Sequence, residues 1–367
     1  MAFTATTTNS AAAWRPDLFT FEPQDALPDA AILSHATLGG RIEGDQPAVR
    51  VAYVLDGTAD FVAEGAEIDE SAPELSEALV YTRKFAQLVR ISREQYRQNG
   101  TADELARSVE RAMTTKADSA FLAQTAPVGP DVAPVAGLAN WAGVLTETVD
   151  GDLDALVDLE AAVRANGANP TVWLLAPDTW AALRKMRTAS GSNQNLLGAG
   201  TDDAAPRLLS IPVAVNARVP SMTGLLVDKR AVISAVSQLE IATSFDQYFT
   251  SDSVAVRATM RTGHVVPRPD RLGRLYIGGV TLSSTLDLGG ATDGTFTLTF
   301  RGRTTAAIAH NANAGAVKTA LVALDDGLLA DAWTVTAAEG KFTIGHPAGV
   351  LTGSGELLVG GTGLVIS

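Results

Sequence analysis

The sequence predicts an α+β protein made of several parts, with a small β-rich domain that contains one helix at its C-terminal end. Apolar and polar residues alternate along residues 49–54 and 254–261, as they do in strands with one buried and one exposed face. Between these strands, apolar residues recur at helical spacing over residues 102–124. From Gly278 onward, Gly, Thr and Ala dominate, which indicates a separate module.

The composition favours a folded protein of roughly two to three domains. Of the 367 residues, 46% are hydrophobic and 19% are charged, so the chain can bury a sizeable core. No apolar run approaches the roughly 20 residues that cross a bilayer, and residues 1–17 lack the pattern of a secretion signal. The absence of cysteine excludes disulfides and suits a reducing cytoplasm. The net charge of -13 argues against wrapping of nucleic acid by a basic surface.

The N-terminal third predicts an arm followed by a projecting hairpin. Residues 1–48 show no period, which fits a flexible tail or an extended arm that becomes ordered against neighbours. After the strand at 49–54, the stretch from Asp56 to Glu77 contains eight acidic residues and no basic one, and it reads as a hairpin tip. Residues 78–98 then alternate as a returning strand and turn basic.

The next segments predict a long helix and a compact mixed unit. Thr101 and Glu104 fit a capping box for the helix at 102–124, which would be roughly 30 Å long. Residues 150–245 contain an amphipathic helix that ends at Gly167, a buried strand at 171–176 and several later strands. A second helix follows that buried strand, and Asp178 is its predicted N-cap.

The sequence also predicts which faces of the strand at 254–261 are buried and which elements form the C-terminal module. The strand at 254–261 is predicted to bury one set of side chains and to expose the other. The buried set is Val254, Val256, Ala258 and Met260, and the exposed set is Ala255, Arg257, Thr259 and Arg261. In the module we expect a hairpin at 294–308, a short helix at 313–324 and a strand pair around Glu339 and Gly340.

No catalytic, cofactor-binding or metal-binding residue is assigned, and no cofactor is expected. The four histidines, His35, His264, His310 and His346, are scattered without metal-ligand spacing. The sequence has no Gly-x-Ser-x-Gly elbow and no phosphate-binding loop, since Gly360 starts a "GGTG" that lacks the following Lys-Ser.

Two groups of carboxylates allow more than one interpretation. In the hairpin tip, Asp56, Asp60, Glu64 and Glu67 could ligate calcium, remain solvated, or meet a basic patch on another subunit. Near the start of the helix at 151–167, four carboxylates either stabilise the helix terminus, which we favour, or form a catalytic pair. These are Glu147, Asp150, Asp152 and Asp154.

Two arginines on the late strand, Arg257 and Arg261, share a face with Thr259. They could clamp a phosphate, but isolated strand arginines more often form ion pairs at surfaces and interfaces. We favour contacts with adjacent subunits.

The order of these segments resembles that of tailed-bacteriophage major capsid proteins with the Hong Kong 97-type fold. "NPTVWLLAPDTWAALRKMRT", "LLG" and "PRLLSIPVAVNARVP" are similar to the axial domain of that family, and "FDQYFTSDSVAVRATMRTGHVVPRPD" is similar to its closing peripheral strands. The resemblance covers residues 1–277. It implies an N-terminal arm (1–48), an extended hairpin loop (49–97), a peripheral domain with a spine helix (98–149), an axial domain (150–244), returning peripheral strands (245–277) and an appended C-terminal surface domain (278–367).

The resemblance also implies a function without catalysis. The expected protein is the major capsid protein of a tailed double-stranded DNA phage, assembled in the host cytoplasm and located in the virion. Copies would form the hexamers and pentamers of an icosahedral shell that encloses DNA without sequence-specific binding and without a membrane. Separate scaffolding, portal and decoration proteins are possible partners. The alternatives are an encapsulin-like nanocompartment and a hydrolase with a carbohydrate-binding tail.

Two departures from the family pattern matter. Some members crosslink through a lysine of the hairpin, but no lysine lies between Asp56 and Glu77, so a crosslink from that loop is not expected. Some members begin with a long helical scaffolding segment, whereas this chain opens with a short polar stretch and is expected to use a separate scaffold or none. The C-terminal domain is expected on the outer surface of the shell.

Overall fold

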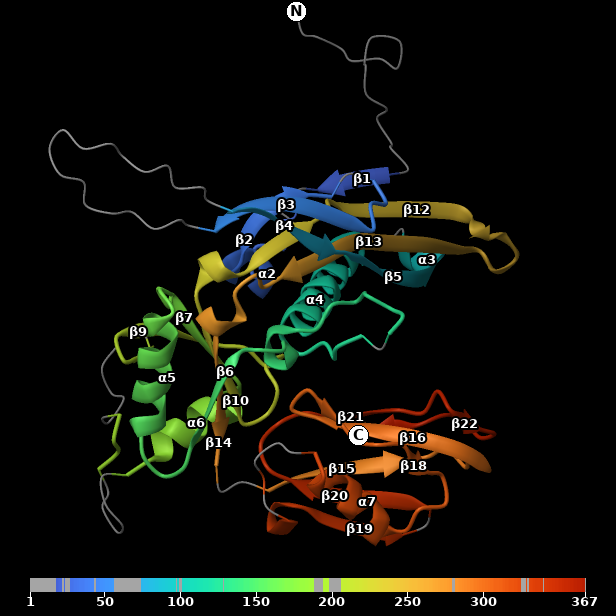
Figure 1. The fold of residues 1–367 in the computed structure, drawn as a ribbon. Helices are drawn as coiled ribbons and strands as arrows, with labels where there is room; N and C mark the ends of the chain where they lie inside the picture. The colour runs from blue at the N-terminus through green and yellow to red at the C-terminus, as the bar shows by residue number, and fades with distance from the viewer. Residues whose placement is uncertain are drawn as a thin grey trace, which may run out of the picture. The chain divides into compact units, whose positions relative to one another are not determined.

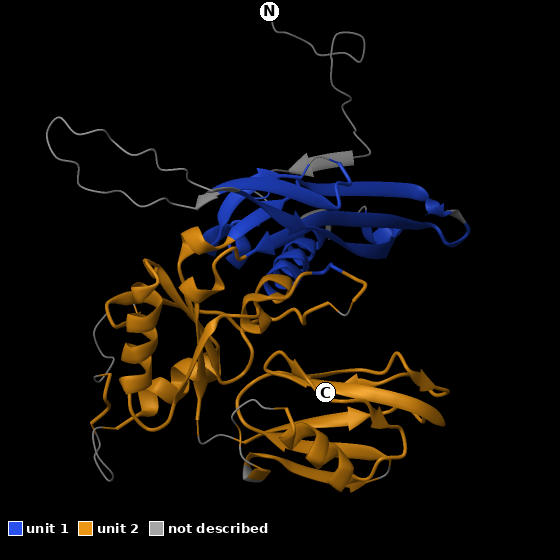
Figure 2. Cartoon of the chain, in the orientation of Figure 1, with its two compact units in different colours: residues 1–118, 132–134, 233–265 blue, residues 119–131, 135–232, 266–367 orange. Residues whose placement is uncertain are grey.

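The computed structural model divides into two compact units (Figure 2). Unit 1 contains residues 1–118, 132–134 and 233–265, and unit 2 contains residues 119–131, 135–232 and 266–367. Residues 1–17 of the predicted arm and residues 56–73 of the predicted hairpin tip lie outside the described residues. The structure describes residues 18–21, 23, 27–42, 44–55, 74–96, 98, 101–127, 129–187, 194–197, 206–278, 281–324, 328, 330–338 and 340–366.

Unit 1 is built around a six-stranded sheet in the order β1-β12-β13-β11-β2, with β5 also paired to β13 (Figure 1). A second, two-stranded sheet pairs β3 with β4. Most of the long helix α4 also belongs to this unit. The elements are β1 (Leu18–Phe21), α2 (Ala31–His35), β2 (Thr37–Arg41), β3 (Ala48–Leu55), β4 (Glu74–Tyr81), β5 (Arg83–Ser92), α3 (Arg93–Tyr96), α4 (Thr101–Leu122), β11 (Ile233–Val236), β12 (Leu239–Tyr248), a 3-10 turn (Phe249–Ser251) and β13 (Ser253–Val265).

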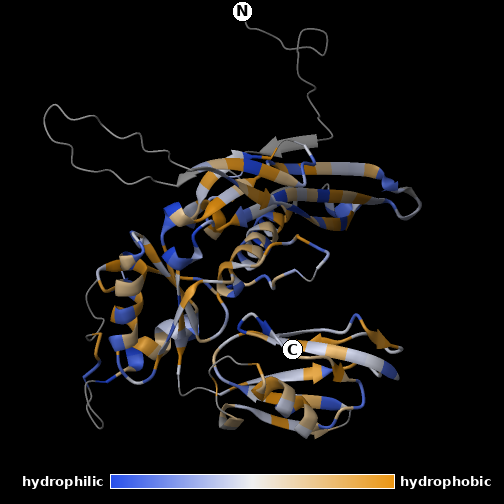
Figure 3. Cartoon of the chain, viewed as in Figure 1, coloured by the Kyte–Doolittle hydropathy of each residue, from blue (hydrophilic) through white to orange (hydrophobic). Residues whose placement is uncertain are grey.

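The centre of the large sheet is β13, whose predicted inner face is confirmed. Val254, Val256, Ala258 and Met260 are all buried, and Figure 3 shows how apolar and polar residues are interspersed along the strands of this sheet. The helix α4, drawn beneath the sheet in Figure 1, buries Val109, Met113 and Ala117 at successive turns, as four-residue spacing requires.

Of the four residues predicted to be exposed on the outer face of β13, only Arg257 is exposed: Thr259 and Arg261 are half-buried, and Ala255 is buried. Ala255 is 4% exposed rather than solvated. Its partner on β5 is Arg90, whose guanidinium carbon lies 4.6 Å from the centre of the Tyr248 ring. A small methyl group between such long neighbours is covered by them, so the sequence alternation alone overestimates its exposure.

The returning strand of the hairpin is shorter than predicted. The antiparallel pairing of β3 with β4 stops at Ala48 and Tyr81, and β5 then pairs with β13 over ten residues from Arg83 to Ser92. Thr82 marks the change of sheet, because its backbone N–H donates to the Pro47 carbonyl (2.8 Å) and its hydroxyl donates to the Gln46 carbonyl (2.7 Å). The prediction of one strand over 78–98 is therefore wrong: two strands with different partners, followed by the short helix α3, occupy this stretch.

Unit 2 contains a mixed six-stranded sheet in the order β6-β14-β10-β7-β9-β8. Two of its pairs, β6 with β14 and β7 with β9, are parallel, and the others are antiparallel. The first part of this unit contains a 3-10 turn (Leu138–Asn140), β6 (Leu145–Val149), α5 (Asp154–Ala165), β7 (Val172–Leu175), α6 (Pro177–Lys185), β8 (Arg207–Leu208), β9 (Ile211–Val215), β10 (Thr223–Val227), 3-10 turns (Lys229–Ala231 and Pro269–Arg271) and β14 (Gly273–Ile277).

The core of this part joins the sheet to its two helices. Trp173 and Leu175 of β7 pack in one cluster with Leu156 and Leu159 of α5 and with Leu183 of α6. All four residues of β7 are buried, as the uninterrupted apolar run predicts. The end of α5 also matches the prediction, since Gly167 has a left-handed φ of +75° just beyond the helix.

Asp178 is not the N-cap of α6. The cap residue is Ala176 and Pro177 begins the helix, a position where the missing N–H of proline costs nothing. The Asp178 carboxylate instead accepts hydrogen bonds from the Ser221 hydroxyl and from the Met222 backbone N–H (3.1 Å). It therefore ties the helix to the turn before β10 rather than capping it.

The last part of unit 2 is the β-rich module predicted from the change in composition. One four-stranded sheet has the order β19-β20-β15-β23, and in a second sheet β16 pairs with β17, β18, β21 and β22. Phe296, Phe300, Trp333 and Ile344 are buried in a core of its own, which α7 closes with Val317 and Leu321. The elements are β15 (Leu282–Asp287), β16 (Asp293–Phe300), β17 (Arg303–Thr304), β18 (Ile308–Ala309), α7 (Ala314–Val322), a 3-10 turn (Ala330–Ala332), β19 (Thr334–Ala338), β20 (Lys341–His346), β21 (Leu351–Ser354), β22 (Leu358–Val359) and β23 (Val365–Ile366).

The two units divide the chain at other positions than the predicted segments. The chain returns to unit 1 at Ile233, before the expected boundary at 245, and it leaves after Val265. β14 lies in the sheet of unit 2, between β6 and β10. Residues 266–277 thus contribute to the mixed unit rather than to the sheet that contains β13.

Candidate functional site

The outer face of the large sheet in unit 1 gathers exposed basic residues from two strands. The register pairs Arg257 with Leu88 and Arg261 with Lys84, so these side chains point to the same face. Lys84, Arg90 and Arg257 are exposed, and Leu88 between them is 56% exposed. We call Lys84, Leu88, Arg90 and Arg257 the basic face. Because these cations surround an exposed leucine, the basic face matches a protein surface that carries both carboxylates and apolar groups better than it matches a nucleic-acid backbone, which offers phosphates alone.

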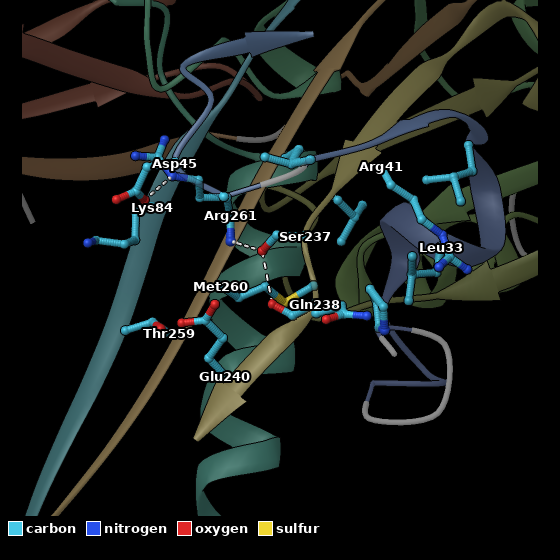
Figure 4. Close-up of a pocket in the computed structure, with 15 residues that line it drawn as sticks. Leu33, Arg41, Asp45, Lys84, Ser237, Gln238, Glu240, Thr259, Met260 and Arg261 are labelled. Atoms are coloured by element: carbon cyan, nitrogen blue, oxygen red, sulfur yellow. Dashed lines mark hydrogen bonds and ion pairs between the residues drawn. The ribbon is translucent and has the colours of Figure 1, made fainter. Parts of the chain in front are cut away.

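A pocket of about 380 Å³ lies next to Lys84 (Figure 4). Leu33 and Met260 contribute apolar surface, and Arg41 and Lys84 contribute positive charge. The side chains come from α2, β2, β5, β11, β12 and β13 and from the loops beside them, so no short stretch of sequence encodes the pocket. Its carboxylates, Asp45 and Glu240, make its charge mixed.

Arg261 is held within its own chain. Its Nε lies 3.1 Å from the Asp45 carboxylate, and its backbone N–H donates to the Ser237 hydroxyl over 2.8 Å, as the dashed lines of Figure 4 show. Its guanidinium also donates to the Thr82 hydroxyl (3.4 Å), and only 17% of its side chain is exposed. Arg261 therefore has partners within its own chain, whereas Arg257 is exposed; that these arginines contact adjacent subunits stays a prediction.

Two of the four carboxylates near the start of α5, Asp152 and Asp154, follow the helix-terminus interpretation. Asp154 lies in the first turn of α5, where the helix dipole favours negative charge. The Asp152 carboxylate accepts a hydrogen bond from the Asp154 backbone N–H (3.1 Å). Glu147 lies on the edge strand β6, and Asp150 follows that strand. The four acidic residues of the hairpin tip lie outside the described residues.

The four histidines lie in different elements. His35 ends α2, and His264 is buried in β13. In the module, His310 Nδ1 lies 4.0 Å from an Asp293 carboxylate oxygen. His346 is 2% exposed, and its Nε2 and Nδ1 lie within hydrogen-bond distance of the Ser284 hydroxyl (3.0 Å) and the Pro347 carbonyl (2.8 Å). Burial, more than the nearby Arg301 charge, lowers the pKa of His346 below its ordinary value.

Among the described residues, no group of three or more His, Asp or Glu side chains is arranged to hold a metal ion. No helix in the described part of the chain is long and apolar enough to span a membrane.

Sequence reasoning missed several polar contacts that position the elements. In unit 1 the buried Asp118 of α4 accepts a hydrogen bond from the Ala31 backbone N–H (2.7 Å). In unit 2 the buried Arg274 donates to the Trp141 carbonyl (2.6 Å). An ionisable residue inside an apolar run signals such a contact, but its partner is more than 80 residues away in each case, so the sequence cannot name it.

Comparisons with known proteins agree with this architecture. The model of the phage capsid family matches residues 34–274, which is more than half of the chain and ends before the C-terminal module. No curated protein matches the chain.

Several solved structures share the fold. A chain of Gordonia phage Cozz has a TM-score of 0.55 and 16% identity, over 68% of this chain and 87% of that chain. The capsid of an empty GTA particle has a TM-score of 0.53 and 18% identity, over 75% and 95% of the two chains. A chain of Microbacterium phage Oxtober96 has a TM-score of 0.53 and 15% identity, over 76% and 96%.

These identities are low, so the structural likeness shows the fold, and the family match shows the relationship. The fold is the Hong Kong 97-type fold predicted from the order of segments. The chain belongs to the phage capsid family and is a capsid protein.

Proposed function

We propose that copies of this chain, as the major capsid protein of a tailed phage, assemble into hexamers and pentamers of an icosahedral shell. The shell encloses double-stranded DNA without sequence-specific contacts. Assembly takes place in the host cytoplasm, with separate scaffolding, portal and decoration proteins as possible partners. The chain acts through its shape and performs no catalysis.

The domain roles implied by the resemblance are part of this proposal. Unit 1 serves as the peripheral domain with α4 as its spine, and the first part of unit 2 serves as the axial domain around which capsomers form. Residues before β1 form the arm, and the β3–β4 hairpin carries the projecting segment. The module after Gly278 stands on the outer surface of the shell.

The observation that carries the assembly proposal is a complementarity of charge within one sequence. The basic face is exposed on unit 1, and the segment 56–77 carries eight carboxylates and no cation. The same segment contains Phe61 and Ile68, which match the exposed Leu88 in character. Contact between the hairpin of one copy and the basic face of another brings these groups together, and opposite charges then set the register of the copies.

Electron microscopy of purified full-length protein tests this proposal. The wild type is expected to form capsomers or closed shells, and native particles are expected to contain nuclease-resistant DNA. Reversing two charges of the basic face, Lys84→Glu with Arg257→Glu, is expected to reduce the yield of shells at least about tenfold, because like charges then face each other. The matched control, Arg303→Glu with Lys318→Glu in the module, makes the same change in net charge and is expected to assemble.

Rescue makes the test specific. Adding Asp60→Lys and Glu64→Lys to the variant of the basic face is expected to restore shells, because the attraction is re-established with its signs exchanged. A wild-type protein that stays monomeric at high concentration, with or without a scaffold, contradicts the capsid proposal. Particles that contain an enzyme instead of DNA support the encapsulin-like alternative, and a hydrolytic activity lost on changing Glu147 or Asp150 supports the hydrolase.

A further inference from the structure

The C-terminal module is joined to the sheet of unit 2 at the end of β14. Tyr276 is the next-to-last residue of that strand and is only 2% exposed. The chain leaves the sheet at Gly278 and enters the first strand of the module at Leu282. A connection this short allows a second contact between the module and β14 to control their mutual orientation.

Arg301 of the module makes such a contact. Its guanidinium carbon lies 3.9 Å from the centre of the Tyr276 ring, within the range of a cation–π interaction. Its Nε and one Nη donate to the Ala348 carbonyl over 3.0 and 2.6 Å. The planar guanidinium of Arg301 therefore contacts Tyr276 of β14 with its face and donates its hydrogen bonds within the module from its edge.

The backbone places this side chain in an unusual way. Arg301 has a φ of +49°, in the left-handed region that long side chains seldom adopt, and Gly302 follows with a φ of +80°. The β16–β17 turn thus presents arginine at a position that favours glycine or asparagine. A strained residue with two defined partners is typical of a specific role.

His346 lies beside this contact. The centre of its ring is 5.4 Å from that of Phe300, which precedes Arg301 in the chain. His346 itself lies two residues before Ala348, whose carbonyl binds Arg301. The Pro347 carbonyl can only accept, so Nδ1 carries the proton in the neutral ring and Nε2 accepts from the Ser284 hydroxyl. A second proton would place a buried cation next to the Arg301 guanidinium and reverse the Ser284 hydrogen bond.

We propose that Arg301 and His346 form a latch that fixes the C-terminal module on β14 and opens on acidification. The closed latch makes the module a rigid extension of the sheet. The proposal stands apart from shell assembly, because every residue in it belongs to one chain and one unit.

The surroundings of His346 support control by this single group. β15 presents Ser284, the end of β16 presents Phe300 and Arg301, and the segment before β19 presents Trp333, whose ring centre is 6.4 Å from that of His346. Burial lowers the pKa of His346 most, the hydrogen bond to the Pro347 carbonyl opposes it, and the charge of Arg301 lowers the pKa further. Lys341 and Asp287 pair with each other at the opposite end of the β15–β20 ladder.

The direction of the pH effect follows from linkage. In the closed latch, burial and the Arg301 charge, opposed by the hydrogen bond to the Pro347 carbonyl, keep the pKa of His346 below the ordinary 6.5. We infer that opening the latch moves the Arg301 guanidinium away from the ring and raises this pKa toward 6.5. Below that pH the open form binds a proton that the closed form excludes. The ratio of open to closed forms therefore rises by up to about tenfold per pH unit until the pH reaches the lowered pKa.

Distance measurements between two spin labels test the latch in the full chain. Because the sequence has no cysteine, Thr146→Cys on β6 and Ala316→Cys on α7 introduce the only two labelling sites. At neutral pH the distribution of distances is expected to be narrow. Arg301→Ala and Tyr276→Leu are expected to broaden it about twofold or more, because the contact between the module and β14 through Arg301 is then lost. Tyr276→Phe is the matched control, since it retains the ring face and is expected to stay narrow.

A second comparison, between variants at low pH, tests whether His346 causes the opening of the latch. Lowering the pH to about 5 is expected to broaden the distribution of the wild type and of His310→Gln, which removes the other histidine of the module. His346→Gln and His346→Asn, which cannot be protonated, are expected to stay narrow. The near-ultraviolet circular dichroism of each variant, compared with that of the wild type, reports whether the buried aromatic side chains, Trp333 of the module among them, remain packed.

Two results overturn the proposal. A narrow distribution in folded Arg301→Ala and Tyr276→Leu shows that other contacts hold the module. Equal broadening at low pH with and without His346 shows that the acid response comes from another group. If one of the two His346 variants unfolds, the other is used for the measurement. His346→Asn preserves the hydrogen bond to the Pro347 carbonyl, and His346→Gln preserves the hydrogen bond to the Ser284 hydroxyl.

Discussion

Met260 and Leu88 show at the level of single residues how the two faces of one sheet differ. Both are apolar and both lie in the ladder of β5 and β13, but Met260 is 2% exposed and Leu88 is 56% exposed. Met260→Asp is expected to destabilise unit 1 by several kcal/mol and to block folding or assembly, because an unpaired carboxylate is buried there. Leu88→Asp is the control and is expected to change the melting temperature little. Thermal unfolding measures both, and a normal melting temperature for Met260→Asp would show that its face is misassigned.

Asp287 provides a pH-dependent prediction within the module. Its hydrogen bond to Lys341, followed by one from the Gly289 backbone, lowers the pKa of its carboxyl from 3.8. A carboxyl with a lowered folded pKa stabilises the fold above its unfolded pKa, and this contribution is lost as the pH falls through the folded value. Asp287→Asn should therefore lower the melting temperature of the module at neutral pH and have a smaller effect at about pH 2. Glu356→Gln, at an exposed position, is the control; an equal difference at both pH values would contradict the role of this charge.

At the scale of elements, the sequence predicts those whose signals are local. The spine helix, expected at 102–124, occupies Thr101–Leu122, and the buried strand around Trp173 forms as β7. In the module, Asn313 caps α7 through the Ala316 backbone N–H, and Gly340 turns between β19 and β20 with a φ of +77°. Periodicity, caps and turn residues act over a few positions, so the local sequence is enough to predict the elements that depend on them.

Elements defined by distant partners could not be predicted in this way. Nothing near Thr82 in the sequence reports that the chain changes sheets there, because the change depends on Pro47 and on β13. Gly263 on β13 permits the crossing, since a Cβ there would lie 2.1 Å from the Tyr81 carbonyl oxygen. The pocket beside Lys84 was missed for the same reason: six elements supply its walls, and Arg41 and Asp45 carry no local signal.

At the scale of the whole molecule, the module after Gly278 is a separable body. It has its own hydrophobic core, and the family match ends before it, at residue 274. Deleting residues 281–367 is therefore expected to leave a folded chain that still forms shells, with reduced stability at the surface around Tyr276. Electron microscopy and circular dichroism of the shortened chain check this. Complete unfolding would place the boundary elsewhere.

The position of β14 has a mechanical consequence. The strand that leads to the module lies inside the sheet of unit 2, hydrogen-bonded to β6 on one side and to β10 on the other. A force that pulls on the module along this strand must shear two ladders at once, whereas a strand at the edge would peel away from one. The point at which the module joins unit 2 is therefore held on both sides, so that a load on the folded module is borne by the whole sheet rather than by one ladder.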